Sequence, residues 1–187
     1  MSDFVLAPAD ADKEFLLRTA RGAVADGLAG REAHPAAPPP ECSAVPQMEL
    51  GAFVTLELDG VLRGCIGQLT GSGPLYVTVA RMAQAAAFGD SRFAPLTAAE
   101  AGRVTYCVSV MGPVTPCPDP ALIETGRHGL VVRRGAHAGL LLPQVAAEHG
   151  WNRETFLEHT CRKAGLAPDA WRSAGTQIFW FEAVIIR

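Results

Sequence analysis

The densest cluster of chemically useful residues in the sequence is the stretch LRGCIGQLTGSG, at residues 62–73. It holds Arg63 and Cys65 together with the glycines Gly64 and Gly67. A nearby guanidinium and exposed backbone amides favour the thiolate form of a cysteine. The thiolate is the form that acts as a nucleophile, a redox group or a metal ligand. This stretch therefore makes Cys65 a candidate catalytic residue.

Two plainer interpretations of the stretch stay open. A cysteine beside glycines also packs as a small apolar residue where two backbones approach closely. A glycine-rich turn before a helix at Pro74 could instead present amides to an anion, although the stretch matches neither GxxxxGK[ST] nor GxGxxG. Arg63 and Cys65 share one face of a strand only if that strand stays regular through Gly64.

A second group of functional side chains lies in FGDSRFAPLT, at residues 88–97. Arg92 offers a planar set of donors that suits a carboxylate or a phosphate, and Asp90 could orient it. In the alternative interpretation the segment is a structural link, in which Phe93 fills the core. Local chemistry supports both interpretations equally.

Metal and cofactor sites have no support in the spacing of the five histidines, which lacks HExxH or a similar pattern. We therefore expect no metal and no cofactor. A triad of Cys65 with a histidine and an acid stays open, because triads assemble from residues distant in sequence. Arg127, Arg133 and Arg134 could form a local nucleic-acid patch, but a solvated hairpin is the preferred interpretation.

The composition describes an ordinary globular chain. Its 187 residues are 49% hydrophobic and 19% charged, with a formal net charge of −3. This balance provides no electrostatic attraction to nucleic acid or to an anionic membrane. We expect neither a signal peptide nor a membrane span, and the five widely spaced cysteines indicate reduced thiols in the cytoplasm.

The first half of the chain predicts a helix, a hairpin and a second helix. Apolar residues recur at helical spacing from Asp12 to Leu28, with Asp10 or Asp12 as the cap. The proline-rich residues 33–47 then form a long surface connection. Alternation on both sides of Asp59-Gly60 predicts a hairpin that carries Cys65 on its returning strand. A helix follows from Pro74, and TAAE at residues 97–100 is a capping box.

The second half of the chain interleaves strands and short helices without a regular strand–helix–strand rhythm. We expect a strand in VTYCVSVMGP at residues 104–113, a hairpin around residues 135–139 and a closing apolar strand at residues 176–186. Helices are expected in PQVAAEHG, in NRETFLEHTCRKAG after Asn152, and in PDAW. The pattern favours an α+β fold with a mainly antiparallel sheet and flanking helices.

Several separated motifs, in a fixed order, resemble the AMMECR family (the AMME chromosomal region domain), whose prokaryotic members are called protein A of the AmmeMemoRadiSam system. The resemblance covers residues 15–186, so we expect residues 1–187 to form a single domain of this family. Similar proteins occur among its bacterial and archaeal members. The matching blocks are LRGCIG with Cys65, DSRFAP with Asp90 and Arg92, GRHG with His128, and LLPQVAAEHGW with Pro143 and Trp151.

The resemblance implies a fold of two unequal lobes around a cleft that is lined by the LRGCIG motif. It also implies association with Memo-type and radical-SAM proteins. The chain itself has no CxxxCxxC motif, so it is not the radical-SAM member. Family-level suggestions of activity include a role for the motif cysteine and the binding of nucleotide or RNA.

The leading functional hypothesis combines the residues with the resemblance. It describes an enzyme or enzyme subunit in which Cys65 supplies a reactive thiol and Arg63 and Arg92 hold an anionic small molecule. Asp90 would orient Arg92, and the amides of Gly64 and Gly67 would complete the anion site. The alternatives are a non-catalytic scaffold for the Memo-type and radical-SAM proteins, and a nucleotide- or RNA-binding module.

Overall fold

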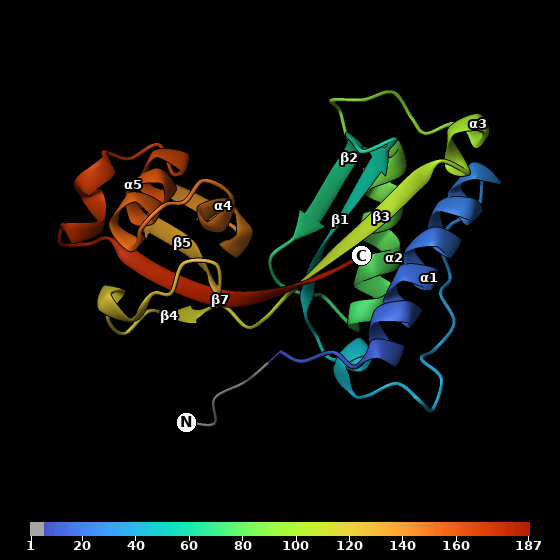
Figure 1. The fold of residues 1–187 in the computed structure, drawn as a ribbon, viewed down its shortest axis with the longest axis horizontal. Helices are drawn as coiled ribbons and strands as arrows, with labels where there is room; N and C mark the ends of the chain where they lie inside the picture. The colour runs from blue at the N-terminus through green and yellow to red at the C-terminus, as the bar shows by residue number, and fades with distance from the viewer. Residues whose placement is uncertain (1–5) are drawn as a thin grey trace. The chain divides into compact units, whose positions relative to one another are not determined.

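The computed structural model describes residues 6–187 of the chain. These residues divide into two compact units of unequal size. Unit 1 consists of the chain up to Met111 together with Val184–Arg187, and unit 2 consists of Gly112–Ala183. In each unit, helices pack on antiparallel strands, which confirms the predicted α+β class (Figure 1).

Unit 1 contains two long helices and sheet strands in the order β2-β1-β3, in which both the β1–β2 and the β1–β3 pairs are antiparallel. The predicted helices and the hairpin are all present. The elements are α1 (Asp10–Leu28), the 3-10 helix η1 (Val45–Gln47), β1 (Gly51–Leu58), β2 (Val61–Gln68), α2 (Leu75–Phe88), α3 (Ala98–Ala101) and β3 (Val104–Met111).

The hairpin turn between β1 and β2 has the geometry that the sequence predicts. Asp59 has φ 52° and Gly60 has φ 79°. Two successive residues with positive φ are typical of a type I′ turn, whose twist matches that of the flanking strands. The ladder after this turn places Thr55 opposite Cys65.

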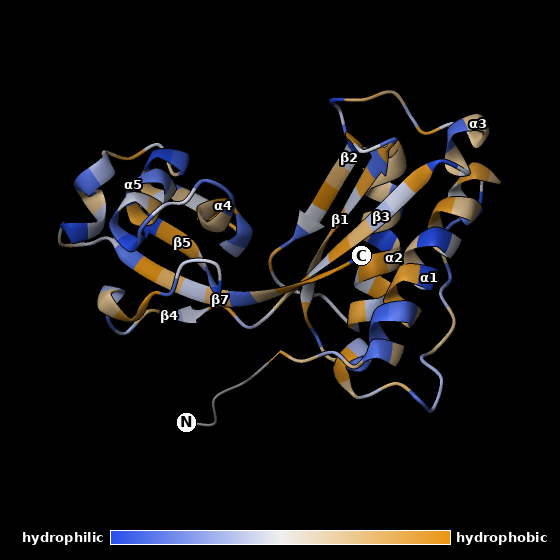
Figure 2. Ribbon diagram, viewed as in Figure 1, coloured by the Kyte–Doolittle hydropathy of each residue, from blue (hydrophilic) through white to orange (hydrophobic). Residues whose placement is uncertain are grey.

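The core of unit 1 lies between one face of this sheet and the helices. Val54 and Leu56 of β1 and Val108 of β3 are fully buried, because alternate strand residues point to the same face. Leu16 of α1 and Val79 of α2 pack in the same cluster. Figure 2 shows the matching colours: α2 is largely hydrophobic, whereas α1 alternates along its length.

Unit 2 is built around β7, the last strand of the chain, which pairs with β4 and with β5. Strand β5 also pairs with β6. Leu130, Phe156 and Leu157 are fully buried in its core. The elements are β4 (Thr115–Pro116), the 3-10 helix η2 (Pro120–Leu122), β5 (His128–Arg134), β6 (His137–Leu141), α4 (Pro143–Glu148), α5 (Arg153–Lys163), the 3-10 helix η3 (Pro168–Arg172) and β7 (Gln177–Ile186), whose residues from Val184 onward belong to unit 1.

Two local predictions are wrong in detail. Helix α1 begins at Asp10 after Ala9, and Asp12 acts inside the first turn, where its carboxylate accepts the amide of Ala9 at 2.8 Å. PDAW forms the 3-10 helix η3 and not an α-helix, as is common for short connecting segments. The caps predicted for α5 are correct: Asn152 accepts the amide of Thr155 at 2.9 Å.

Within residues 6–187, no helix is long and apolar enough to span a bilayer. The same residues contain no group of three or more His, Cys, Asp or Glu side chains placed to hold a metal ion.

Candidate functional site

Two cysteines and a threonine form a row across the unit 1 sheet. The β1–β2 ladder places Thr55 opposite Cys65, and the β1–β3 ladder places Thr55 opposite Cys107. Directly opposed residues point to the same face of a sheet. Because Val54 and Leu56 face the helices, this row lies on the other face, which we call the thiol face. All three side chains are half-buried.

The backbone of Cys65 is held by a pair of charged side chains from the segment after α2. Asp90 Oδ2 accepts the Cys65 amide at 2.9 Å, and Arg92 Nη2 donates to the Cys65 carbonyl at 3.3 Å. Asp90 in turn accepts from Arg92 Nε at 2.9 Å and from Nη2 at 2.6 Å. The pair thus satisfies one amide and one carbonyl of β2, which is an end strand of the sheet.

Both members of this pair are held in their charged forms. The hydrogen bonds from the Arg92 side chain and from the Cys65 amide hold the pKa of Asp90 well below its usual range. The pKa of Arg92 is raised, chiefly by its hydrogen bond to Asp90. The Asp90 side chain is 4% exposed and the Arg92 side chain is 54% exposed. Arg92 therefore presents a fixed positive charge to solvent beside Cys65.

The sulfur of Cys65 has its own hydrogen-bond donor. Thr55 Oγ1 donates to Cys65 Sγ at 3.2 Å. This hydrogen bond fixes the position of the Cys65 sulfur on the thiol face. Sequence reasoning did not single out Thr55, although its place on the polar side of the alternating strand was visible. The alternation shows only which face Thr55 lies on. The residues opposite it depend on the register of the strand pairs, which the alternation does not give.

The thiols outside this face lie in less favourable surroundings. Burial raises the pKa of Cys42, of Cys117 and of Cys161. Cys161 is fully buried in α5. These three cysteines are therefore less reactive than a free thiol at neutral pH.

Arg63 points away from the row of thiols. The β1–β2 register shifts between Leu56 and Glu57, which lie opposite Gly64 and Leu62, so that Arg63 is the extra residue of a β-bulge. This resolves the question that the sequence left open, since the strand is not regular through Gly64. A bulge redirects a side chain, and here the Arg63 guanidinium meets α3.

Glu100 of α3 is the partner of Arg63. Its carboxylate accepts from Arg63 Nε at 2.9 Å and from Nη2 at 3.2 Å, and the Arg63 side chain is only 13% exposed. The hydrogen bonds from Arg63 and Thr97 lower the pKa of Glu100 to about 2. The sequence identified Glu100 as part of a capping box but gave no sign of its pairing with Arg63. The use of Arg63 to hold an anion stays a prediction, because its charge is already paired.

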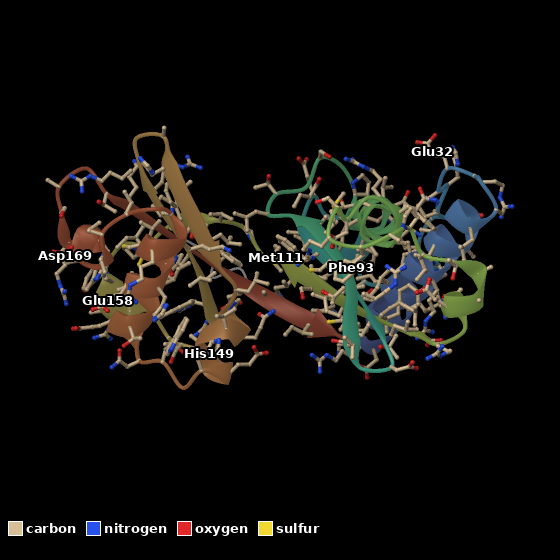
Figure 3. All side chains as sticks on the ribbon, turned by 90° about the horizontal axis from the view of Figure 1, so that it is seen from above. Glu32, Phe93, Met111, His149, Glu158 and Asp169 are labelled. Carbon is tan, nitrogen blue, oxygen red and sulfur yellow. The ribbon has the colours of Figure 1, made fainter. Side chains whose placement is uncertain are left out.

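Phe93 lies between the two arginines. Its ring centroid is 6.0 Å from the guanidinium carbon of Arg63 and 5.4 Å from that of Arg92. Arg63 Nη2 also donates to the Pro95 carbonyl at 3.4 Å. Phe93, labelled in Figure 3, thus belongs to the segment that connects the charged pairs. The DSRFAP motif therefore acts as one unit beside β2.

The two motif glycines lie inside β2 and have packing reasons of their own. A Cβ atom at Gly64 would lie 2.1 Å from the carbonyl oxygen of Ala86 in α2. A Cβ atom at Gly67 would lie 2.2 Å from the Phe53 ring, which covers this glycine on the thiol face. The ladder, and not a turn, contains both residues. Their predicted role in an anion site stays a prediction, and close approach explains both glycines without it.

The predicted functional residues of unit 2 have local partners. His128 is buried, its ring centroid lies 4.5 Å from that of Trp180 in a tilted arrangement, and its Nδ1 accepts the Glu124 amide at 3.0 Å. Burial lowers the pKa of His128, so its imidazole is neutral at pH 7. Arg127 pairs with Glu182 at 2.7 Å. The hydrogen bonds of Cys65 within residues 6–187 involve no histidine.

Comparison with known proteins gives one consistent result. A family model described as AMMECR1 matches residues 17–186. A protein of Pyrococcus furiosus is 42% identical over 184 residues, covering 92% of this chain and 86% of its own length. A protein of Methanopyrus kandleri is 42% identical over 181 residues, with the same coverage of 92% and 86%.

A solved structure shares the fold. The crystal structure of an uncharacterized protein from Pyrococcus horikoshii has a TM-score of 0.79 and 39% sequence identity. The match covers 92% of this chain and 89% of that chain. The archaeal relatives therefore extend over both units.

Proposed function

The chain belongs to the AMMECR1 family, and on that basis we propose that it is an enzyme or enzyme subunit whose reactive group is the Cys65 thiol. The observation that carries this proposal is the number of contacts that fix one residue. Asp90 holds the Cys65 amide, Arg92 holds its carbonyl, and Thr55 donates to its sulfur. The Asp90 and Arg92 contacts would hold the backbone of any residue at this position, whereas the contact from Thr55 is made to the cysteine sulfur itself.

The fixed position favours nucleophilic chemistry. A nucleophile held by its backbone and by a hydrogen-bond donor does not have to reorganise when it reacts. Thr55 donates a hydrogen bond to the sulfur, and the Arg92 guanidinium binds the carbonyl of the same residue. Cys65 is half-buried on the thiol face, so a substrate atom can approach it.

The substrate class follows from the charge of Arg92. Arg92 uses Nε and Nη2 to bind Asp90 and Cys65, and Nη1 has no protein hydrogen bond within residues 6–187. A half-exposed guanidinium with one uncommitted nitrogen suits a carboxylate or a phosphate. Asp90 is then the positioning residue that aims Arg92. The substrate would be a small anion whose electrophilic atom lies over Cys65.

The second candidate function is a non-catalytic scaffold, and the tip of the β1–β2 hairpin favours it. Val61 is 69% exposed and Leu62 is 41% exposed, although both are large and apolar. Neighbouring exposed apolar residues are typical of a contact surface for another protein. The resemblance to the AmmeMemoRadiSam system suggests Memo-type and radical-SAM proteins as the partners.

Alkylation of the cysteines distinguishes the two candidates. Each thiol is labelled with iodoacetamide at several pH values and quantified by peptide mass spectrometry. We expect Cys65 to label faster than Cys107 at pH 7 in the native protein. In Thr55→Val the rate at Cys65 should fall about fivefold, which corresponds to about 1 kcal/mol for one lost hydrogen bond.

Cys107 is the matched control, because it lies on the other side of Thr55 on the same face. Its labelling rate should be unchanged in Thr55→Val. A Cys65 thiol that labels only after unfolding would contradict the reactive-thiol proposal. In that case the scaffold remains, and Val61→Ser with Leu62→Ser should then abolish partner binding while Cys65→Ser leaves it intact.

A further inference from the structure

The proline-rich connection after α1 is fixed to the body of unit 1 at its first end. We call residues 33–43 the strap (Figure 1). Gln84 of α2 accepts the Ala33 amide on Oε1 at 3.3 Å and donates from Nε2 to the Arg31 carbonyl at 3.0 Å. The same Nε2 donates to the Ala23 carbonyl of α1 at 2.9 Å. One amide side chain therefore joins α1, α2 and the start of the strap.

A buried carboxylate fixes the other end of the strap. Asp12 Oδ1 accepts the Ser43 amide at 2.8 Å, and Oδ2 accepts the Ser43 hydroxyl at 2.6 Å. Asp12 is fully buried. Between these two anchors the strap runs beside α1, and Glu32, just before the strap, is exposed (Figure 3).

A hollow of about 450 Å³ lies between the strap and α1. Small-molecule sites have volumes of about 300–1,000 Å³ and mostly apolar walls with a few polar groups. The walls here are Phe15 and Ala23 of α1 and the alanines and prolines of the strap, and Arg18, Asp26 and His34 supply polar groups. Because both walls are anchored, the hollow is formed before any ligand arrives.

Gly22 keeps the middle of this hollow open. It lies in the interior of α1, where glycine destabilises a helix relative to alanine. A Cβ atom at Gly27, five residues later, would lie 2.3 Å from the Phe88 ring, so packing requires that glycine. A Cβ atom at Gly22 would meet nothing within 4 Å. Packing does not explain Gly22, whereas a ligand in the hollow does.

The hollow has opposite charges along its α1 wall. Arg18 and Asp26 are eight residues apart, which separates them by roughly 12 Å along the helix axis. Glu14 binds Nη1 of Arg18 at 2.8 Å, and Arg31 binds Oδ1 of Asp26 at 2.6 Å. Within residues 6–187, no hydrogen bond engages Arg18 Nη2 or Asp26 Oδ2. Arg18 and Asp26 are each already ion-paired, but both keep polar atoms with which a ligand can form further hydrogen bonds.

From this complementarity we propose that the hollow binds a short apolar peptide with free ends. The ammonium end lies toward Asp26 and the carboxylate end toward Arg18, and the apolar side chains pack on Phe15 and the strap prolines. An extended tripeptide is roughly 10 Å long, which is comparable with the roughly 12 Å between Arg18 and Asp26 along the helix axis. This site is separate from Cys65 and does not depend on the function proposed for it.

The test is an NMR titration of ¹⁵N-labelled protein with the tripeptide Ala-Leu-Ala. We expect saturable shifts of the Gly22 and Ala23 amides, and binding at least tenfold weaker for the N-acetylated, C-amidated peptide. Gly22→Leu should abolish binding, because its side chain fills the hollow. Gly22→Ala is the matched control and should retain it, since one methyl group leaves most of the volume free.

Three results would overturn the proposal: no saturable shift at millimolar peptide, equal affinity for the blocked peptide, or wild-type affinity in Gly22→Leu. Circular dichroism checks that the variants fold, and leucine is a better helix former than glycine. If Gly22→Leu does not fold, the double variant Arg18→Gln, Asp26→Asn replaces it. We expect that variant to bind the free and the blocked peptides with the same affinity. If it still prefers the peptide with free ends, the proposal is overturned.

Discussion

Glu100 shows how a single carboxylate connects two parts of unit 1. It accepts from both Nε and Nη2 of Arg63 and also from the amide and hydroxyl of Thr97. The resulting pKa of about 2 lies well below the value of about 4.3 for an unfolded glutamate. A carboxylate with a lowered pKa in the folded state stabilises that state wherever it is ionised.

The stability of the protein should therefore decrease on acidification in a defined window. The contribution of Glu100 is complete above about pH 4.3 and is lost as the pH falls toward 2. Asp90, whose pKa is also lowered, adds to the decrease. We expect Glu100→Gln to have a lower melting temperature than the native protein at pH 6 and a flatter pH dependence between pH 4.3 and 2.

Thermal unfolding followed by circular dichroism at a series of pH values measures this effect. Asp59→Asn removes an exposed ion pair with Arg103 and serves as the control, with little change expected because exposed pairs contribute little. If the melting temperatures of Glu100→Gln and of the native protein fall equally steeply with pH below 4.3, Glu100 does not cause the loss of stability in acid.

The sequence predicted the site residues better than their contacts. Cys65, Asp90 and Arg92 do lie together, because a strand and the segment after the next helix are adjacent in a hairpin–helix arrangement. Thr55 could not be assigned to Cys65, since a shift of register by one residue would point it to the other face. The partner of Arg63 was not predictable either, because the bulge that turns Arg63 toward Glu100 leaves no local signal.

Strand β2 and helix α2 approach each other at a point that only glycine allows. A Cβ atom at Gly64 would lie 2.1 Å from the Ala86 carbonyl oxygen, and this oxygen belongs to a helix backbone that cannot rotate away. The motif glycine therefore sets the distance between β2 and α2. Through β2 it also sets the position of Cys65.

Gly64→Ala should lower the free energy of unfolding by about 2–3 kcal/mol, within the range for overpacked cores. The midpoint and slope of urea unfolding measure this change. Gly102→Ala is the matched control, because a Cβ atom there would meet nothing within 4 Å and should change the free energy of unfolding by less than about 1 kcal/mol. If the two variants have equal stability, close approach is not the reason for Gly64.

Elements specified by local residues were predictable, and those specified by distant residues were not. Asp59-Gly60 and the alternation around it determine the hairpin, and Asn152 determines the start of α5. The strap was predicted only as a surface connection. Its fixed position depends on Gln84 and Asp12, which are 51 and 31 residues away from the atoms that they bind.

At the scale of the whole molecule, each unit has its own core. Leu16 and Val79 are fully buried in the unit 1 cluster, whereas Leu130 and Phe156 are fully buried in unit 2. Compact units with separate cores can open at different free energies. The α+β class was predictable from the order of the elements. The boundary after Met111 was not, because no linker composition marks it.

Phe156→Ala should test the separation of the cores. Loss of a fully buried phenylalanine destabilises by about 3–5 kcal/mol. We expect amide hydrogen exchange in β5, β6 and α5 to accelerate at least about 100-fold, the factor that corresponds to about 3 kcal/mol. Amides of α1 and α2 should exchange at nearly native rates, as measured by mass spectrometry of peptic peptides.

Leu16→Ala is the reciprocal variant and should accelerate exchange in α1 and α2 while sparing α5. Equal acceleration in both units by either variant would mean that the molecule unfolds as a single cooperative unit.

The Asp90–Arg92 pair has a consequence beyond the chemistry of Cys65. Unpaired amides and carbonyls along an end strand form a template to which another chain can add, and this is a common route to aggregation. By occupying the Cys65 amide and carbonyl, the pair interrupts that template in the middle of β2. Variants that lose Asp90 should therefore be less soluble, so a test of the activity proposed for Cys65 in such a variant is informative only when its state of association matches that of the native protein.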